Sequence, residues 1–301
     1  MKLKVDINPK IRKLFKLCKS FFTPIALVFI VASIYQSRLI VRDAWIDSQP
    51  YYLVIAVVLW MLAHLFSPWF VSIILNACGA KIPYRDNLAL HLNYLPARYI
   101  PGGVWHTVAR VTGLHHLGVQ PINLTSFVIV ENLVALCITL VVGGIFISFD
   151  QKNTYLKITI YLVVALCMIL LLMCPYFLNK FLLKNKFIRY RKYIAGLLVA
   201  IFFWMIASIS FLFYISSFFE VDSLNICIKI IGSYLFAWGV GFISLFAPQG
   251  FGIFELVAAK VMPLNFNFSA TVGIMAGFRL IVMSADLLMW ICWKTFRFFL
   301  D

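Results

Sequence analysis

The chain has 301 residues, of which 63% are hydrophobic and only 12% carry a charged side chain. Soluble domains are about half apolar and about one-quarter charged, so this composition excludes an ordinary soluble protein. The net charge is +15, but the lysines and arginines gather in short segments beside apolar stretches, as the positive-inside rule describes. We therefore predict an all-α, polytopic helical membrane protein that does not bind nucleic acid.

The chain begins with a segment, residues 1–19, that is rich in lysine and arginine and precedes the first apolar stretch. We interpret this segment as a basic cytoplasmic tail and residues 20–301 as a single integral membrane domain. The first apolar stretch is expected to stay as a membrane span, because no signal-peptidase site follows it. These features predict a protein of the cytoplasmic (inner) membrane with its N-terminus in the cytoplasm.

Seven apolar stretches have the roughly 20 residues that a helix needs to cross a bilayer. They cover about residues 20–38, 50–78, 121–149, 154–178, 193–218, 224–247 and 268–293. Seven crossings would leave the C-terminus outside, whereas Lys294 and Arg297 favour the inside. We therefore favour eight crossings over seven, with the additional one after Pro248.

The longest link between spans contains the sequence "YLPARYIPGGVWHTVARV", which holds charged side chains and a helix break at Pro101, Gly102 and Gly103. Proline ends a helix and glycine frees the backbone, so the segment near residues 84–118 is predicted to form a re-entrant or interfacial hairpin. Non-helical backbone at membrane depth requires protein or a water-filled cavity around it.

A second stretch, "PQGFGIFELVAAK" at residues 248–260, repeats the order of residue types in "PGGVWHTVAR". Glu255 takes the place of His106, and Lys260 lies roughly where Arg110 lies. A second re-entrant segment is therefore predicted near residues 248–262. Weak symmetry of this kind is typical of transporter repeats, although a chance match stays an alternative. The expected breaks are at Pro248, Gly250 and Gly252.

Charged side chains also occur inside predicted spans, at Glu131, Arg279 and Asp286. A charge at the centre of a membrane helix costs about 2.5–3.5 kcal/mol on insertion scales, so each should have a partner or line a polar cavity. Arg279 and Asp286 are separated by about 10 Å of helical rise, too far for an ideal direct pair. Glu131 or Glu255 could face Arg279. Structural ion pairs and a polar pathway are both open, and we favour the pathway.

Basic side chains near the two broken segments are candidates for binding an anionic headgroup, since guanidinium groups match phosphate oxygens. The candidate headgroup ligands are Arg98, Arg110, Lys260 and Arg279, and the candidate polar pathway consists of His106, Glu131, Glu255 and Asp286. No nucleotide-binding or metal-binding motif is present, so we expect no cofactor, no metal and no assigned catalytic residue. His64 is interpreted as a satisfied core histidine.

The order of these motifs resembles the membrane region of the lysylphosphatidylglycerol synthase/flippase family. The family pattern R-x-x-P-G falls on Arg98, Pro101 and Gly102, and P-x-G-x-G-x-x-E falls on Pro248, Gly250, Gly252 and Glu255, with a late arginine at Arg279. Asn132 follows Glu131 where the family often has arginine. The resemblance implies a lipid-handling membrane protein without lysyl transfer, because the chain ends at Asp301 before any aminoacyl-transferase domain.

The function expected from these observations is translocation of an anionic or polyprenyl-linked lipid between leaflets, in cell-envelope or surface-glycan biogenesis. The expected partners are membrane lipids. One alternative is a non-catalytic membrane partner of a glycosyltransferase. A less favoured alternative is a lipid-modifying enzyme that uses Glu131, Glu255 or His106 as acid or base. A proton drive through Glu131, Glu255 or Asp286 stays open.

Overall fold

The structure is a computed structural model that describes residues 31–32, 35–36, 38–99, 105–149, 151, 153–183, 188–243, 250, 252–262 and 268–298. Within these ranges every regular element is a helix and no strand occurs. The predicted basic tail, residues 20–30 of the first predicted span, and the predicted breaks at Pro101, Gly102, Gly103 and Pro248 lie outside the described residues.

The described elements follow one another as α2 (Arg38–Ile46), α3 (Pro50–Ala77), α4 (Tyr84–Asn93), the 3-10 helix η1 (Leu95–Tyr99), α5 (Trp105–His116), α6 (Pro121–Ser148), α7 (Thr154–Phe177), the π-helical turn η2 (Leu178–Leu182), α8 (Tyr190–Ser216), α9 (Leu224–Ile243), α10 (Ile253–Val261) and α11 (Phe268–Phe298). Local chemistry sets several of these boundaries. Proline opens both α3 and α6, where its fixed φ suits the first helical position. The Asn153 side chain caps α7 by accepting from the Leu156 amide.

Six helices in the described part of the chain are long and apolar enough to cross a membrane: α3, α6, α7 with η2, α8, α9 and α11. They confirm the six predicted spans that fall on described residues, and the chain is an integral membrane protein. α10 has nine residues and is about 14 Å long. It is therefore too short to be the additional crossing that we expected after Pro248.

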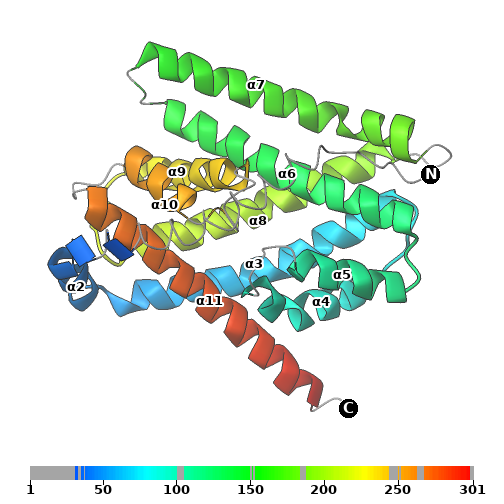
Figure 1. The fold of residues 1–301 in the computed structure, drawn as a ribbon, viewed down its shortest axis with the longest axis horizontal. Helices are drawn as coiled ribbons and strands as arrows, with labels where there is room; N and C mark the ends of the chain where they lie inside the picture. The colour runs from blue at the N-terminus through cyan, green and yellow to red at the C-terminus, as the bar shows by residue number, and fades with distance from the viewer. Residues whose placement is uncertain are drawn as a thin grey trace, which may run out of the picture.

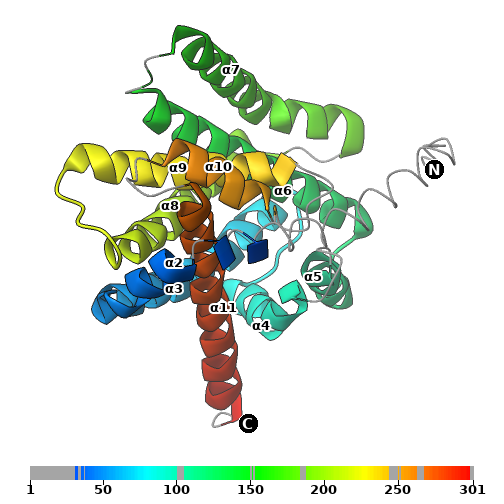
Figure 2. The same cartoon turned by 60° about the vertical axis from the view of Figure 1, so that its left-hand side comes forward.

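The long helices pack in pairs that cross one another (Figure 1). α3 lies along α8, and α6 lies between α7 and α9. α11 crosses this arrangement: it contacts α2 and α10 as well as α3, and it also contacts α4 and η1 (Figure 2). α11 is therefore the helix that touches both of the regions predicted to contain broken segments.

An aromatic cluster fixes α10 to the long helices. The Phe211 ring of α8 lies 4.9 Å, centroid to centroid, from both Tyr234 of α9 and Phe278 of α11. Phe254 of α10 makes edge contacts with Phe211 and Tyr234. Offset and edge-to-face ring pairs of this kind add stability beyond the burial of apolar area. The short helix is thus held in the core although it does not span it.

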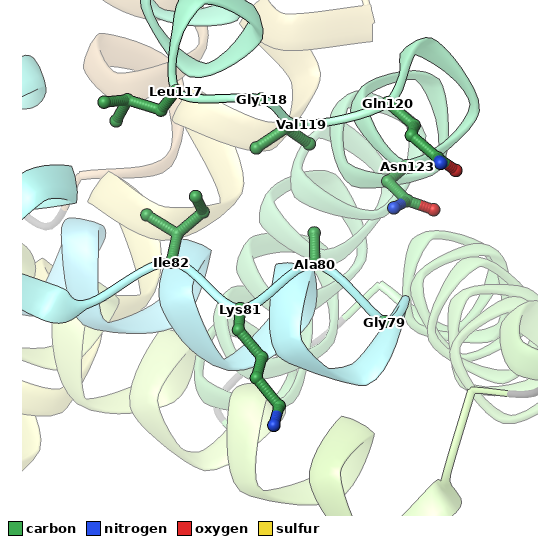
Figure 3. Close-up of a pocket in the computed structure, with 9 residues that line it drawn as sticks. All are labelled: Gly79, Ala80, Lys81, Ile82, Leu117, Gly118, Val119, Gln120 and Asn123. Carbon is green, nitrogen blue, oxygen red and sulfur yellow. The ribbon is translucent and has the colours of Figure 1, made fainter.

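The helices α4 and α5 form a hairpin whose two ends lie together. The loop before α4 and the loop after α5 line one cavity of about 210 Å³ (Figure 3). Gly79 and Gly118 turn these loops with φ angles of 90° and 85°, which favour glycine. Both helices are shorter than a membrane span. The loops before α4 and after α5 therefore lie side by side, and the re-entrant or interfacial hairpin stays a prediction.

The crossing of α6 and α9 depends on the absence of side chains at two glycines. A Cβ atom added at Gly143 would lie 2.5 Å from the backbone nitrogen of Phe236. A Cβ atom added at Gly232 would lie 2.6 Å from the Cβ of Phe146. Small residues allow membrane helices to approach this closely, and the approach maximises van der Waals packing.

We expect Gly143→Ala to lower the free energy of unfolding by about 1–3 kcal/mol, because the new methyl group meets backbone that cannot move independently. Gly144→Ala is the matched control, since its Cβ would meet only side-chain methyl groups of Val164 and Ile160, which can shift. Thermal unfolding of the purified protein in detergent measures the difference. Equal stability of the two variants would contradict the close approach of α6 and α9.

Cysteine labelling tests the hairpin. In a variant that lacks the native cysteines, Lys81→Cys and Leu117→Cys should both react with a membrane-impermeant maleimide added to the same side of sealed vesicles, because both positions line one cavity. Phe149→Cys, at the other end of α6, is the control and should react only from the opposite side. Reaction of Lys81→Cys and Leu117→Cys from opposite sides would rule out a hairpin that returns.

Candidate functional site

The carboxylate of Asp286, only 1% exposed on α11, is the centre of the polar site. Its Oδ1 accepts hydrogen bonds from Trp60 Nε1 at 3.1 Å and from His64 Nε2 at 2.7 Å. Its Oδ2 accepts from Arg98 Nη1 at 3.0 Å and from the Tyr99 hydroxyl at 2.9 Å. A buried carboxylate with four donors, one of which is a guanidinium, is compensated in charge and in hydrogen bonding.

The local sequence explains how these donors reach one point. Trp60 and His64 are four residues apart on α3 and therefore share one face of that helix. Pro96 has no backbone N–H to donate to the carbonyl of Leu92, so the α-helical ladder does not continue through it; α4 ends at Asn93 and the chain continues as η1. η1 packs against α11 and brings Arg98 and Tyr99 to Asp286.

A chain of histidines leads away from Asp286. His64 Nδ1 lies 3.0 Å from His91 Nε2 on α4, and the His91 ring makes an edge contact with the His106 ring of α5 at 5.6 Å. His91 Nδ1 and His106 Nε2 are buried and have no hydrogen-bond partner among the described residues. Burial, helped by the positive charges of Arg98 and Arg110, lowers the pKa of His91 well below its usual value and that of His106 to about 2. Both imidazoles are therefore neutral at physiological pH.

A second ion pair joins the hairpin to α6. Arg110 of α5 is 8% exposed at its side chain and donates from Nη1 to Glu131 Oε1 at 2.9 Å. The guanidinium also lies 5.4 Å from the centre of the Phe127 ring, a cation–π contact. Asn132, the residue after Glu131, donates to the carbonyl of Val128 in its own helix and takes no part in the pair.

A third ion pair joins α10 to α11. Glu255 is fully buried, and Arg279 Nε donates to its Oε1 at 2.5 Å. The other oxygen, Oε2, accepts from the amide of Gly252 at 2.7 Å. Glu255 thus occupies the third position of α10 and reaches back to the amide that precedes the helix, where a negative charge also suits the helix dipole. Gly252 has a φ of 83°, so its place in this turn requires glycine.

The structure therefore brings the two sets of predicted site residues together: the candidate headgroup arginines form ion pairs with the candidate pathway carboxylates. Each of the three arginines expected to bind headgroups is paired with a carboxylate expected in the pathway, because a buried charge requires an opposite charge. Of the two carboxylates that could face Arg279, the structure selects Glu255. Lys260 differs from the arginines, since it is exposed at the last turn of α10. His106 lies beside His91, and Gly250 has a φ of 68°.

Sequence reasoning missed four members of the Asp286 site: Trp60, His64, His91 and Tyr99. His64 is buried and satisfied, as expected, but one of its partners is the carboxylate of Asp286 and the other is a second histidine. The spacing of Trp60 and His64 was the available signal, because two polar side chains on one face of an apolar helix indicate a common partner. No feature of the sequence indicated that His91 would contact His64.

Comparisons with known proteins do not assign the site. No family model, curated protein or solved structure matches this chain. In the described ranges, no group of three or more His, Cys, Asp or Glu side chains has an arrangement that could hold a metal ion. The site therefore contains three arginine–carboxylate pairs, one of them built on the buried Asp286, and a series of imidazoles that begins beside that carboxylate.

Glu255→Gln should lower the free energy of unfolding by about 2–3 kcal/mol, because it leaves Arg279, 26% exposed at its side chain, without its carboxylate. Adding Arg279→Gln should restore part of the loss, which a double-mutant cycle in detergent would measure. Asp43→Asn removes the exposed pair with Arg42 and should cost less than about 1 kcal/mol. A cycle with no coupling between positions 255 and 279 would contradict the pairing.

Proposed function

We propose that this protein translocates an anionic or polyprenyl-linked lipid between the leaflets of the cytoplasmic membrane, in cell-envelope or surface-glycan biogenesis, with its N-terminus in the cytoplasm. The motif resemblance to the lysylphosphatidylglycerol synthase/flippase family supports this proposal. The observation that carries it is that three arginine–carboxylate pairs each join a short helix to a spanning helix.

The position of these pairs favours transport over a purely structural role. η1, α5 and α10 are too short to cross a membrane, and each contributes one charge to a pair whose other member lies on α6 or α11. Burying ion pairs is often no more stabilising than apolar packing, so stability alone does not account for three of them. Ionisable groups inside membrane proteins commonly mark the path of a polar substrate.

The arginines provide a route for an anionic headgroup by exchange of partners. The side chains of Arg98 and Arg279 are each 26% exposed, whereas Asp286 and Glu255 are buried. A phosphate group that reaches either guanidinium from the exposed side can replace the carboxylate with bidentate hydrogen bonds. The headgroup would then cross between the short helices and α11 while its acyl or prenyl chains stay in the lipid.

The alternatives have less support. A lipid-modifying enzyme would need an acid or base that reaches the lipid, but Glu131 and Glu255 each accept a hydrogen bond from an arginine, and the Nε2 of His106 is buried. A non-catalytic partner of a glycosyltransferase would not need three charge pairs between short and spanning helices. It remains an outcome of the test below.

The test is exchange of fluorescent phosphatidylglycerol between leaflets of vesicles that contain the pure protein, read by dithionite quenching. Wild-type protein should accelerate exchange. Arg98→Gln and Arg279→Gln should each slow it about tenfold or more, the effect of losing a charge-assisted hydrogen bond. Arg98→Lys should be intermediate, because lysine keeps the charge without the planar fork. Arg42→Gln, which removes an exposed arginine on α2, is the control.

Exchange at the wild-type rate in folded Arg98→Gln and Arg279→Gln proteins would contradict the proposal. A wild-type protein that exchanges no lipid but binds a glycosyltransferase stably would favour the partner role instead. Size-exclusion profiles and thermal unfolding separate loss of exchange from loss of fold.

A further inference from the structure

With His64 and His91 both neutral, the hydrogen bonds from Asp286 to His91 have one consistent direction. The carboxylate only accepts, so His64 Nε2 carries the proton that lies between them. A neutral His64 then has an unprotonated Nδ1, which accepts from His91 Nε2–H. A neutral His91 is left with an unprotonated Nδ1, and this atom is buried with no hydrogen-bond partner among the described residues. The series of hydrogen bonds from Asp286 through His64 thus ends at His91 Nδ1, which can accept a proton.

We propose that His91 and His64 form a proton relay to Asp286, and that Asp286 takes up a proton when an anionic phosphate group replaces it on Arg98. This inference rests on the proposed function for the identity of the anion. It adds a ligand, the proton, and assigns roles to two histidines that lipid binding alone does not use.

The transfer balances in atoms and charge. A proton released by a hydronium ion outside the hairpin reaches His91 Nδ1 from the His106 side. His91 then gives its Nε2 proton to His64 Nδ1, and His64 gives its Nε2 proton to Asp286 Oδ1. Both imidazoles end neutral with their tautomers exchanged, and the Asp286 hydroxyl donates to His64 Nε2. The only net change is a carboxylate converted to a carboxylic acid. Release of the anion reverses each step.

Burial makes a relay necessary. Asp286, His64 and His91 are 1%, 2% and 2% exposed, so water does not reach the carboxylate directly. His106 is less buried than His91, packs against it and carries the second partnerless nitrogen, Nε2. The open end of the relay therefore points to α5, the outer helix of the hairpin.

The surrounding charges explain why the proton and the anion are linked. His91 faces His64 of α3, His106 and Arg110 of α5 and Arg98 of η1, and His64 in turn contacts Asp286 of α11. Asp286 itself is held as a carboxylate by Arg98, with Trp60, His64 and Tyr99 donating to it. While Arg98 stays in place, protonation of Asp286 is unfavourable. Once a phosphate takes the guanidinium, Asp286 is a buried charge without a counter-ion and a proton is the available compensation.

Proton uptake on ligand addition tests the relay. The full-length protein in detergent, at pH 7 with a pH-indicator dye and minimal buffer, is mixed with short-chain phosphatidylglycerol in a stopped-flow instrument. Wild type should take up about one proton for each lipid bound, as linkage requires when a carboxylate is neutralised. Asp286→Asn should take up none. Short-chain phosphatidylcholine is the control lipid and should cause no uptake.

His91→Gln isolates the relay, because glutamine can still donate to His64 but has no ring nitrogen to pass a proton. Its uptake should be about a hundredfold or more slower than that of wild type, the effect expected when a positioned proton carrier is lost. His116→Gln, an exposed histidine on α5, should leave the rate unchanged. Thermal unfolding verifies that each variant is folded. Uptake by His91→Gln at the wild-type rate would overturn the relay.

Further experiments distinguish a lipid phosphate from a free phosphate, and distinguish failure of the relay from failure of the proposed function. Uptake with inorganic phosphate as well as with phosphatidylglycerol would support the relay and assign a free phosphate as a ligand. Wild-type protein that binds phosphatidylglycerol without proton uptake, or binds neither anion, would overturn the relay. If proton uptake occurs but vesicles show no lipid exchange, the relay stands and the transport function fails. If vesicles show lipid exchange but no proton uptake occurs, the transport function stands and the relay fails.

Discussion

The requirement that every buried charge have a partner governs the arrangement around α11. This helix carries Arg279 and Asp286, and about 10 Å of helical rise separates them. They do not satisfy each other, so each takes a partner from a different short helix: Glu255 from α10 and Arg98 from η1. The two short elements are therefore placed by electrostatics as much as by apolar packing, since either charge left alone would cost several kcal/mol.

The hairpin also contains a buried ion pair between a short and a spanning helix. Arg110 comes from the short helix α5 and Glu131 from the spanning helix α6, so the spanning helix here provides the acid. The neutral histidines lie between this pair and the Asp286 site, with His91 close to charges from both. Polar groups from α3, α4, α5, η1, α6 and α11 thus form one polar region inside the bundle. Apolar packing holds the bundle together, and the polar region selects which short helix lies against which long one.

The spans were predictable because apolar length alone decides whether a helix can cross a bilayer. α3 and α6 even begin within a residue of the predicted boundaries, since glutamine and proline interrupt the apolar stretch there. The distance between Arg279 and Asp286 along α11 was also predictable, because the rise per residue of an α-helix is fixed. What the sequence could not show was which distant residue supplies each partner. Trp60 and Asp286 are 226 positions apart, and only the packing of α3 against α11 brings them together. The additional crossing expected after Pro248 rested on the positive C-terminus, which suggested an even count, whereas the helix described there, α10, is too short to cross by itself.

α11 carries both charges on one continuous helix, and this restricts the number of states that the molecule can adopt. Two independent ion pairs would give four combinations of open and closed. Because Arg279 and Asp286 are seven residues apart, they lie on nearly the same face, and a rotation of α11 moves both toward or away from their partners together. Rotation of α11 would therefore couple the two pairs, because a rotation that opens one of them also opens the other.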